Sequence, residues 1–328
     1  MFFLSAALIV AAGTLLTKNA EKISKGFNLS TVWAGALLLG LVTSLPELVT
    51  SYRAAIIGVP DLAGGNIYGS ILFNLILIAL IDMVQGRGPL KARRKKSLIL
   101  TALLSIVVII ISMLGVILRL PYRLGWVGLD SIAILLVYLV GNRVIIGFEN
   151  KPQNKDRHDQ KTLTEPAVPK TKEFYYALII FFFAAAIIFF AGTNLTDTAD
   201  LISSETGLNR TIVGSLFIAV TTSLPELVIT LTALRLGYME MAIANIFGSN
   251  IFNILIFFFT DLFYSRGPLF HDLSPYNLIT ALMGILLTTV AIFSLVYPSR
   301  RQFLRMGMPS FIIIFGYLLT FIFLFSLQ

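Results

Sequence analysis

The chain has 328 residues, of which 57% are hydrophobic and only 13% are charged, with a net charge of +8 and no cysteine. Because soluble domains carry about 25% charged residues, this composition excludes an ordinary soluble protein, and the lack of cysteine excludes disulfides and thiolate metal sites. The apolar runs are long and continuous rather than short and alternating, so the sequence predicts an all-α integral membrane protein and not a barrel.

Ten apolar segments follow one another along the chain, each interpreted as a transmembrane helix. The first has the length of a signal peptide, but it lacks a basic region before it and is followed by the polar stretch Lys18 to Lys22, so it is interpreted as a membrane helix. The segments are 2–24, 28–55, 62–84, 97–118, 124–145, 174–198, 208–234, 240–263, 276–296 and 308–327.

A polar stretch at 149–173 separates the fifth segment from the sixth. It is rich in Lys, Asp, Gln, Asn and Pro and has no apolar periodicity, which is typical of a flexible linker rather than of a folded loop domain. The predicted organisation is therefore a first five-helix repeat at 1–148, a linker at 149–173 and a second five-helix repeat at 174–328.

The basic residues predict the orientation of the helices. If the helices alternate in direction, 20 of the 25 Lys and Arg residues lie in loops on one side, most densely at 91–96. The positive-inside rule makes this side cytoplasmic, so we expect a cytoplasmic linker and two external termini. Because the positive charge is spread over loops that set topology, it does not indicate a nucleic-acid partner.

The chain matches itself without a gap when Thr43 is aligned with Thr222, and this register is called the repeat alignment below. Residues 43–90 and 222–269 share 21 identities in 48 positions, among them Thr-Ser-Leu-Pro-Glu-Leu-Val in both copies. One period contains five predicted helices, an odd number, so the second copy would enter the membrane from the opposite side. Inverted repeats are typical of secondary transporters, whose substrate sites lie near the midplane between the repeats.

A proline and a glutamate stand together near the middle of the second and the seventh predicted helix. Proline removes a backbone hydrogen bond, and such a break is tolerated in a membrane where the freed groups face a cavity, a neighbouring helix or an ion. Hydroxyl residues precede each proline and a carboxylate follows it, so one turn offers several oxygens. These residues are Thr43, Ser44 and Glu47 in the first copy and Thr222, Ser223 and Glu226 in the second.

The next predicted helix of each copy adds polar side chains. Ser70 and Asn74 share one helix face through their i, i+4 spacing, and Ser249 and Asn253 do the same in the second copy. Small residues near them allow helices to approach closely. A role in helix packing alone stays open for both asparagines and both serines, because such side chains also hydrogen-bond across membrane helices.

Two aspartates, Asp82 and Asp261, lie two turns beyond the asparagines at equivalent positions of the two copies. Each is near a predicted helix end and near an arginine, Arg87 or Arg266. We therefore favour capping or salt-bridge roles for them over ion binding.

The oxygen chemistry of the two broken turns suits a hard cation. Ca²⁺ takes six to eight oxygen ligands, and Na⁺ is held by carbonyls and hydroxyls in other transporters. No His or Cys lies near these motifs, which disfavours zinc and copper. One Ca²⁺ neutralises two glutamates, and because unpaired charge is costly in a membrane, other cations must replace Ca²⁺ when it leaves. This requirement is the physical basis of exchange.

These motifs resemble the α-repeats of the cation/Ca²⁺ exchanger superfamily, which contains the Na⁺/Ca²⁺ and H⁺/Ca²⁺ exchangers. The shared elements are Thr-Ser-Leu-Pro-Glu and Gly-Ser-x-x-x-Asn in both copies, and the ten-helix plan covers nearly the whole chain. The resemblance implies an antiporter in the plasma (inner) membrane of a prokaryote, surrounded by lipid, with no prosthetic group and no obligate protein partner. It also implies that the first and sixth helices slide across the other eight.

The resemblance further implies particular ligands, with Glu47 and Glu226 as the central pair for Ca²⁺. Backbone carbonyls near Gly40 and Ala219 would add oxygens. Hydroxyls would help to form Na⁺ sites, and two asparagines take the family's polar positions: Thr43, Ser44, Ser70, Thr222, Ser223, Ser249, Asn74 and Asn253.

The chain departs from the family pattern at two places. Val42 and Thr221 stand where the family often has glycine, which would unwind more easily. Many Na⁺-coupled members carry aspartate where this chain has Asn253, so its site has two carboxylates rather than three.

The residues bear on three classes of function: ion exchange, a cation channel and an enzyme. Exchange of Ca²⁺ for Na⁺ is the leading hypothesis because hydroxyls surround both glutamates, and H⁺/Ca²⁺ exchange stays open because two protons balance one Ca²⁺. A cation channel is less favoured because inverted repeats with broken helices indicate alternating access. An enzyme is disfavoured because the sequence has neither a nucleophile–base pair nor metal-ligand spacing.

Overall fold

Apolar helices make up almost all of the structure, a computed structural model that describes residues 1–26, 42–85, 96–149, 172–235, 237, 239–297, 302–303 and 306–327. Seven of the described helices are long and apolar enough to cross a membrane, and a pair bent by 43° would make an eighth. The helices are α1 (Phe2–Gly26), α3 (Leu45–Ile57), α4 (Pro60–Gln85), α5 (Lys96–Leu118), α6 (Leu129–Glu149), α7 (Lys172–Thr206), α8 (Arg210–Ile212), η2 (Val213–Ile218, a π-helix), α9 (Ala219–Thr222), α10 (Leu224–Arg235), α11 (Met239–Phe263), α12 (Leu269–Asp272), α13 (Tyr276–Val296) and α14 (Met308–Ser326).

Eight of the ten predicted segments lie on described helices, with the seventh predicted segment lying on the four successive elements α8, η2, α9 and α10. The predicted start of the fifth segment at residue 124 is wrong, because residues 123–128 form a hairpin and α6 begins at Leu129. The second segment, 28–55, is described only from residue 42 onward. The predicted linker lies outside the described residues except at its two ends, which belong to α6 and α7. The predicted end of the sixth segment at residue 198 is wrong. Helix α7 continues to Thr206 because Ala199 and Ser203 are still buried, and it stops at Gly207, whose φ of +72° glycine adopts without strain.

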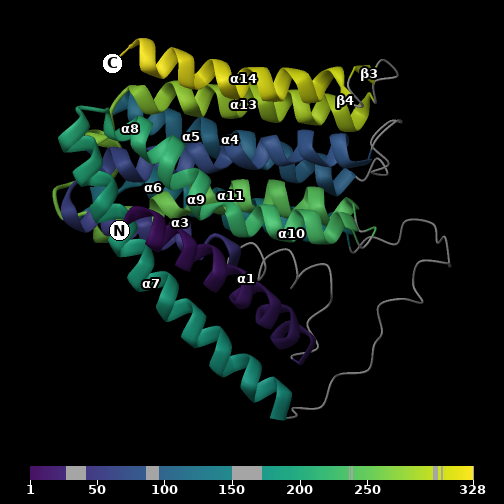
Figure 1. Ribbon diagram of the computed structural model, residues 1–328. Coiled ribbons are helices and arrows are strands. Elements are labelled where there is room, and N and C mark those ends of the chain that lie inside the picture. Colours follow the sequence, from purple (N-terminus) through teal and green to yellow (C-terminus); the bar gives the residue numbers. More distant parts are fainter. Residues whose placement is uncertain are drawn as a thin grey trace.

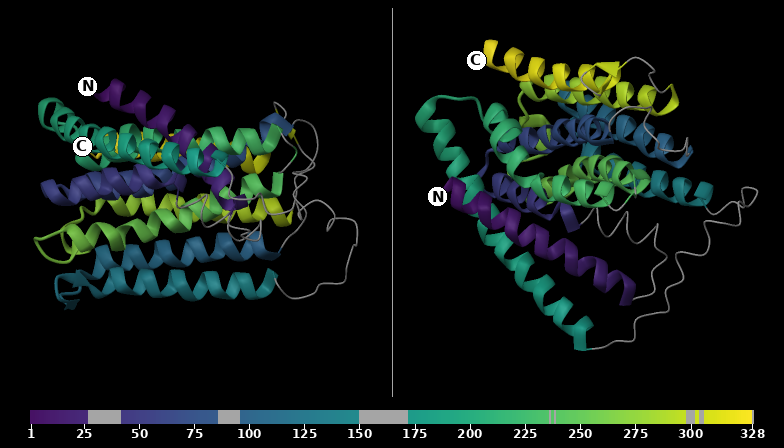
Figure 2. Two further views of the ribbon diagram at one scale, coloured as in Figure 1. Left: turned by 90° about the horizontal axis from the view of Figure 1, so that it is seen from below. Right: turned by 45° about the vertical axis from the view of Figure 1, so that its right-hand side comes forward.

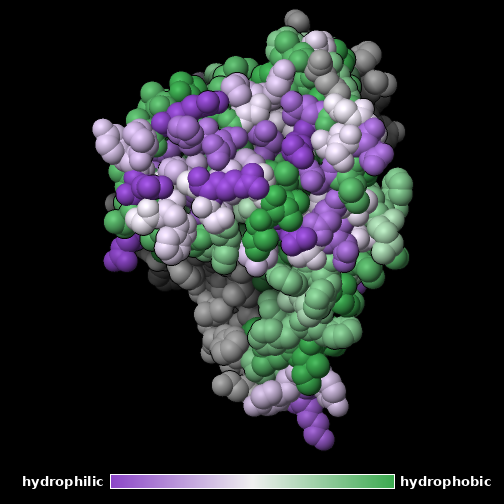
Figure 3. Space-filling view, turned by 90° about the vertical axis from the view of Figure 1, so that its left-hand side faces the viewer, coloured by the Kyte–Doolittle hydropathy of each residue, from purple (hydrophilic) through white to green (hydrophobic). Residues whose placement is uncertain are grey.

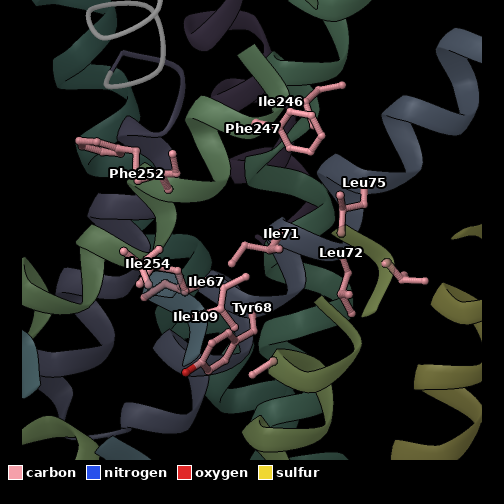
Figure 4. Packing of buried hydrophobic residues seen from close by; sticks show 14 of the residues in the cluster. Ile67, Tyr68, Ile71, Leu72, Leu75, Ile109, Ile246, Phe247, Phe252 and Ile254 are labelled. Atoms are coloured by element: carbon pink, nitrogen blue, oxygen red, sulfur yellow. The ribbon is translucent and has the colours of Figure 1, made fainter. Parts of the chain in front are cut away.

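The main core lies between α4 and α11 and extends over α5, α6, α13 and α14. Figure 4 shows part of this cluster, with Ile67 and Tyr68 of α4 near Ile254 of α11, and Phe247 and Ile246 of α11 farther along the core. Both helices are buried on nearly all sides, so they carry apolar residues around their whole circumference rather than along one stripe.

Backbones approach closely where α4 crosses η2. A Cβ atom added at Gly65 would lie 2.5 Å from the carbonyl oxygen of Thr211, and one added at Gly69 would lie 2.5 Å from Ser215. Gly214 on η2 faces α4 in the same way, at 2.6 Å from the Leu62 oxygen. The close approach predicted for small residues is therefore confirmed at Gly65 and Gly69.

Helices α1 and α7 lie side by side at one edge of the molecule, with α13 and α14 at the opposite edge (Figure 1). In Figure 2, α1 and α7 also lie on the side of the molecule away from α5 and α6. Among the described residues, neither α1 nor α7 contributes a side chain to the main core. Their apolar residues form smaller clusters with α3, η2 and the start of α4.

Two β-hairpins that the sequence analysis did not predict stand at equivalent places of the repeat alignment. Strands β1 (Arg123–Leu124) and β2 (Val127–Gly128) form the first hairpin, and β3 (Gln302–Phe303) and β4 (Met306–Gly307) form its counterpart in the second copy. They lie at opposite ends of the helices (Figure 2). At the end that holds the two chain termini (Figure 1), polar residues gather over the upper part of the face, whereas the lower part is largely hydrophobic (Figure 3).

Each hairpin is held by an aspartate from the other half of the chain. Asp261 Oδ2 accepts hydrogen bonds from the Gly128 amide at 2.8 Å and the Ser131 hydroxyl at 2.6 Å. Asp82 Oδ2 accepts from the Gly307 amide and the Ser310 hydroxyl, both at 2.6 Å. The capping interpretation of both aspartates is thus confirmed, whereas Arg87 lies outside the described residues.

Candidate cation-binding site

The helix breaks predicted at the two prolines are present and equivalent. Ser44 (φ −85°, ψ 12°) precedes α3, and Ser223 (φ −90°, ψ 7°) precedes α10, so each serine interrupts the helix just before the Leu-Pro-Glu sequence. The glutamate then sits in the first turn of the new helix. There the unpaired N–H groups and the helix dipole favour a carboxylate.

The two breaks face each other and exchange hydrogen bonds. The hydroxyl of Ser223 donates to Glu47 Oε1 at 2.8 Å, and the hydroxyl of Ser44 donates to Glu226 Oε1 at 3.4 Å. Each glutamate is therefore oriented by the serine of the opposite half. Both glutamates and both serines are fully buried, so the carboxylates meet in the interior between the two copies of the repeat.

The threonines before these serines also lie at the breaks. Thr222 is near Glu47, and Thr43 is near Glu226, as the pseudo-symmetry requires. Both are buried. All six residues that the sequence analysis placed at the broken turns are thus brought together, three from each copy.

The serines and asparagines of α4 and α11 complete the ten predicted residues. Ser70, Asn74, Ser249 and Asn253 are all fully buried, and Ser70 lies near Glu47. The amide of Asn74 donates to Asn250 Oδ1 at 3.0 Å, which ties α4 to α11 and leaves Asn74 Oδ1 outside this bond. Asn250 corresponds to Ile71 in the repeat alignment, so it is not among the ten residues predicted from the sequence.

Six oxygens of these residues have no hydrogen-bond partner within the part of the chain that the structure describes. Buried polar atoms are nearly always partnered in proteins, so a group of free oxygens requires an explanation. A cation with six to eight oxygen ligands supplies one. The six atoms are Glu47 Oε2, Glu226 Oε2, Ser70 Oγ, Ser249 Oγ, Asn74 Oδ1 and Asn253 Oδ1.

Of the two backbone carbonyls that the resemblance implied as ligands, one lies within the described residues. The Ala219 carbonyl accepts hydrogen bonds from the Ser223 amide at 3.1 Å and the Thr222 hydroxyl at 3.3 Å, so it is already engaged inside the helix. Gly40 lies outside the described residues.

Sequence analysis missed Asn66, which connects three helices around Glu47. Its amide nitrogen lies 3.2 Å from the Glu47 carbonyl oxygen, 2.8 Å from Thr50 Oγ1 and 3.1 Å from Ser51 Oγ. Its Oδ1 accepts from the Thr222 hydroxyl at 3.2 Å. The sequence did contain a feature that points to Asn66, because asparagine occurs at the equivalent positions 66 and 245, each within an apolar helix.

Helices α1 and α7 cover the two breaks through equivalent glycines. A Cβ added at Gly13 of α1 would lie 2.6 Å from Pro225, and one added at Gly192 of α7 would lie 2.9 Å from Val49. The two glycines correspond in the repeat alignment, and both stand in an Ala-Gly-Thr sequence. The repeat therefore extends to the helices that enclose the site.

Comparison with known protein families decides the class of this chain. Residues 1–146 and 176–326 match the model of the family described as sodium/calcium exchanger protein. The chain belongs to the sodium/calcium exchanger family. The matched residues include α1, most of α7 and all ten predicted site residues, and they omit the whole predicted linker at 149–173.

Curated relatives of this exchanger are distant but cover most of its length. An uncharacterized membrane protein of Methanocaldococcus jannaschii is 24% identical over 255 residues, which is 77% of each chain. A protein of Alkalimonas amylolytica named putative antiporter CaxA is 28% identical over 254 residues, 76% of this chain and 75% of its own.

Solved structures share the fold of this exchanger over its whole length. Native YfkE superposes with a TM-score of 0.70 at 16% identity, covering 99% of this chain and 92% of its own. The H⁺/Ca²⁺ exchanger CAX gives 0.69 at 14% identity and coverages of 99% and 80%. The sodium-calcium exchanger NCX_Mj gives 0.59 at 21% identity and coverages of 100% and 97%. At these identities the matches establish the fold alone.

Proposed function

We propose that this exchanger is a secondary active antiporter that exchanges Ca²⁺ for Na⁺ at a site centred on Glu47 and Glu226. The observation that carries the proposal is the pair of fully buried glutamates, each held by a serine of the opposite half and each keeping one free oxygen. Two carboxylates in a membrane interior require about two positive charges. One Ca²⁺ supplies them, and Na⁺ ions replace it on the return step.

Alternating access by two inverted five-helix repeats accounts for the arrangement of the helices. Ten transmembrane helices, with repeats at 1–148 and 174–328 around a cytoplasmic linker, place the equivalent hairpins at opposite ends, as observed. Helices α1 and α7 are the moving pair in this proposal. Their separation from the main core supports that role, and their contacts at Pro225 and Val49 put them directly over the two breaks.

Exchange against H⁺ is the second candidate, and the number of carboxylates favours it. Across the described residues no group of three or more Asp, Glu, His or Cys side chains gathers into a metal site, so the pair of glutamates stands without a third acid. With Asn253 neutral, two protons on the glutamates balance one Ca²⁺. A cation channel is the less favoured alternative, since all ten site residues are buried rather than lining an open pore.

The proposed location is the plasma (inner) membrane of a prokaryote, with both termini outside. The common end of the two termini in the structure agrees with the even number of helices that this topology requires (Figure 1). The transported ions are substrates, and the proposal includes no prosthetic group, no enzymatic step and no obligate protein partner.

Uptake of radioactive ⁴⁵Ca²⁺ into proteoliposomes that hold the purified protein tests this proposal. An outward Na⁺ gradient and an outward H⁺ gradient are compared at equal membrane potential, for the wild type and for Glu47→Gln and Glu226→Gln, which keep the side-chain shape and remove the charge. Thr232→Ala, at an exposed position of α10, is the matched control.

Uptake driven by Na⁺ and lost in both glutamate variants supports Na⁺/Ca²⁺ exchange. Uptake driven only by H⁺ moves the assignment to the second candidate. A Ca²⁺ leak that no gradient drives indicates a channel, and wild-type uptake in either glutamate variant refutes the proposed site.

A further inference from the structure

The two copies of the repeat differ in the hydrogen-bond partners that they provide for an equivalent asparagine. In the first copy, the amide of Asn66 donates to Thr50 Oγ1, Ser51 Oγ and the Glu47 carbonyl, and its oxygen accepts from Thr222. Every hydrogen-bonding atom of the Asn66 side chain is thereby used within the protein.

The second copy has the same asparagine without these partners. In the repeat alignment, Asn245 corresponds to Asn66 and Thr230 corresponds to Ser51. Ile229 replaces Thr50, whose hydroxyl oxygen accepts the shortest hydrogen bond from Asn66. Asn245 is only 4% exposed and Thr230 is fully buried. Yet both amide atoms of Asn245 and the Thr230 hydroxyl have no hydrogen-bond partner in the described part of the chain.

The sequence difference accounts for this structural difference. An isoleucine side chain accepts no hydrogen bond, so the amide of Asn245 loses the partner that fixes its counterpart. Buried amides and hydroxyls normally find a partner, because leaving them unpaired is unfavourable. Glu226 Oε2 is a third free oxygen in the same copy. At Asn245 and Thr230 the second copy therefore contains uncommitted oxygens, where Asn66 and Ser51 of the first copy are hydrogen-bonded.

We propose that Asn245 Oδ1, Thr230 Oγ1 and Glu226 Oε2 bind one Na⁺ in the second half of the molecule, at a position whose first-half counterpart is closed by Asn66. This inference rests on the proposed antiport function and adds two ligands to it. One carboxylate with neutral amide and hydroxyl oxygens suits a hard monovalent cation. A proton does not replace Na⁺ on the two new ligands, because neither an amide nor a hydroxyl takes up a proton near neutral pH.

Thermal unfolding of the purified protein in Ca²⁺-free detergent solution tests the Na⁺ position without requiring transport. NaCl is titrated against choline chloride at constant ionic strength, and the rise in Tm gives the half-saturating Na⁺ concentration. Thr230→Val removes one oxygen at nearly constant shape, and Asn245→Ala removes the amide. Ser51→Ala is the matched first-half control, and the apparent KM for Ca²⁺ in proteoliposomes is measured for each variant.

We expect Thr230→Val and Asn245→Ala to raise the half-saturating Na⁺ concentration about tenfold, the factor that ~1.4 kcal/mol represents, with the KM for Ca²⁺ changed less than about twofold. Ser51→Ala should leave Na⁺ binding unchanged. Equal shifts in Thr230→Val and Ser51→Ala would show a structural role and overturn the inference, as would a wild-type Tm that does not respond to Na⁺. If the Na⁺ response follows the expected pattern while Ca²⁺ uptake is absent, the proposed function fails and the Na⁺ site stands.

Discussion

The helix bundle and the α1–α7 pair are stabilised by different interactions. The bundle has one continuous apolar core, close backbone contact at Gly65 and Gly69, and hairpins fixed by buried aspartates. The pair shares only small clusters with the rest of the molecule. Close-packed cores do not deform continuously, whereas small separate contacts can be exchanged. We infer that the bundle is the fixed body of the transporter and the pair its moving part.

The pair also carries polar contacts that differ between the two copies. Arg53 of α3 binds Asp197 of α7 with two nitrogen–oxygen contacts, Nε–Oδ1 at 2.7 Å and a second at 2.9 Å. Beside it, the Thr196 hydroxyl donates to the Thr50 carbonyl at 3.1 Å. In the repeat alignment Thr232 stands in place of Arg53 and Lys18 in place of Asp197, so the ion pair exists in one copy alone.

The largest effect is expected where backbones touch inside the bundle. In Gly65→Ala the new Cβ would lie 2.5 Å from the Thr211 carbonyl and 2.9 Å from the Ser215 amide, neither of which can move without shifting η2. We expect a loss of about 3 kcal/mol in unfolding free energy or a failure to fold. The measurement is Tm in detergent together with elution as a single species.

Gly147→Ala in α6 is the matched control for that substitution, since an added Cβ meets nothing within 4 Å among the described residues. A stable Gly65→Ala protein with wild-type uptake would show that α4 and η2 are not rigidly joined, and would remove the distinction between body and moving pair.

A smaller loss is expected at the hairpins. Asp261→Ala deprives the Gly128 amide, the Leu269 amide and the Ser131 hydroxyl of their acceptor, whereas Asp82→Ala deprives two donors. Unpaired buried donors cost about 1–3 kcal/mol each, partly recovered by relaxation. We therefore expect both variants to lower Tm, Asp261→Ala more than Asp82→Ala. The asparagine variants, which keep an acceptor oxygen, should lie between; equal Tm for all four variants and wild type contradicts the capping role.

The smallest effect on stability is expected from the ion pair between α3 and α7. The Arg53 and Asp197 side chains are 32% and 41% exposed, and ion pairs in such positions contribute about 0–1 kcal/mol. Asp197→Asn should therefore barely change Tm. If α7 moves as proposed, the substitution should also change the distance distribution between spin labels on α7 and α13, because the Arg53–Asp197 ion pair joins α7 to α3.

The exchanged variant Arg53→Asp/Asp197→Arg provides the control for this effect. It should restore the wild-type distance distribution, since the two charges remain in contact. An unchanged distribution in Asp197→Asn, or a large fall in Tm, would show that α7 is part of the rigid body.

Local sequence patterns were sufficient to predict the helices and the two breaks. Apolar length predicts the membrane segments, and proline before glutamate predicts the interrupted turn. The ten candidate residues could be named because Thr-Ser-Leu-Pro-Glu and Gly-Ser-x-x-x-Asn occur in both copies of the repeat. All ten residues are buried, and this burial depends on how the helices pack.

Contacts between the two halves could not be derived from local patterns. The exchange between Ser44 and Glu226, the three-helix position of Asn66 and the capping of one hairpin by the other half depend on how the copies are docked. Part of this information was available in the repeat. Gly128 and Ser131 recur as Gly307 and Ser310 in the repeat alignment, and extending the comparison of the copies that far would have indicated the hairpins.

Equilibrium binding of ⁴⁵Ca²⁺ to the purified protein tests the central claim that Glu47 and Glu226 form one site between the halves. We predict one Ca²⁺ per chain in the wild type, and binding weakened about 10- to 150-fold in both Glu47→Gln and Glu226→Gln, since a lost charged ligand is worth about 1.5–3 kcal/mol. In the double variant we expect no further loss of Ca²⁺ binding that the measurement can detect, because either single variant already reaches the detection limit. Wild-type affinity in either single variant, or two independent Ca²⁺ ions of which each variant loses one, would contradict a shared site.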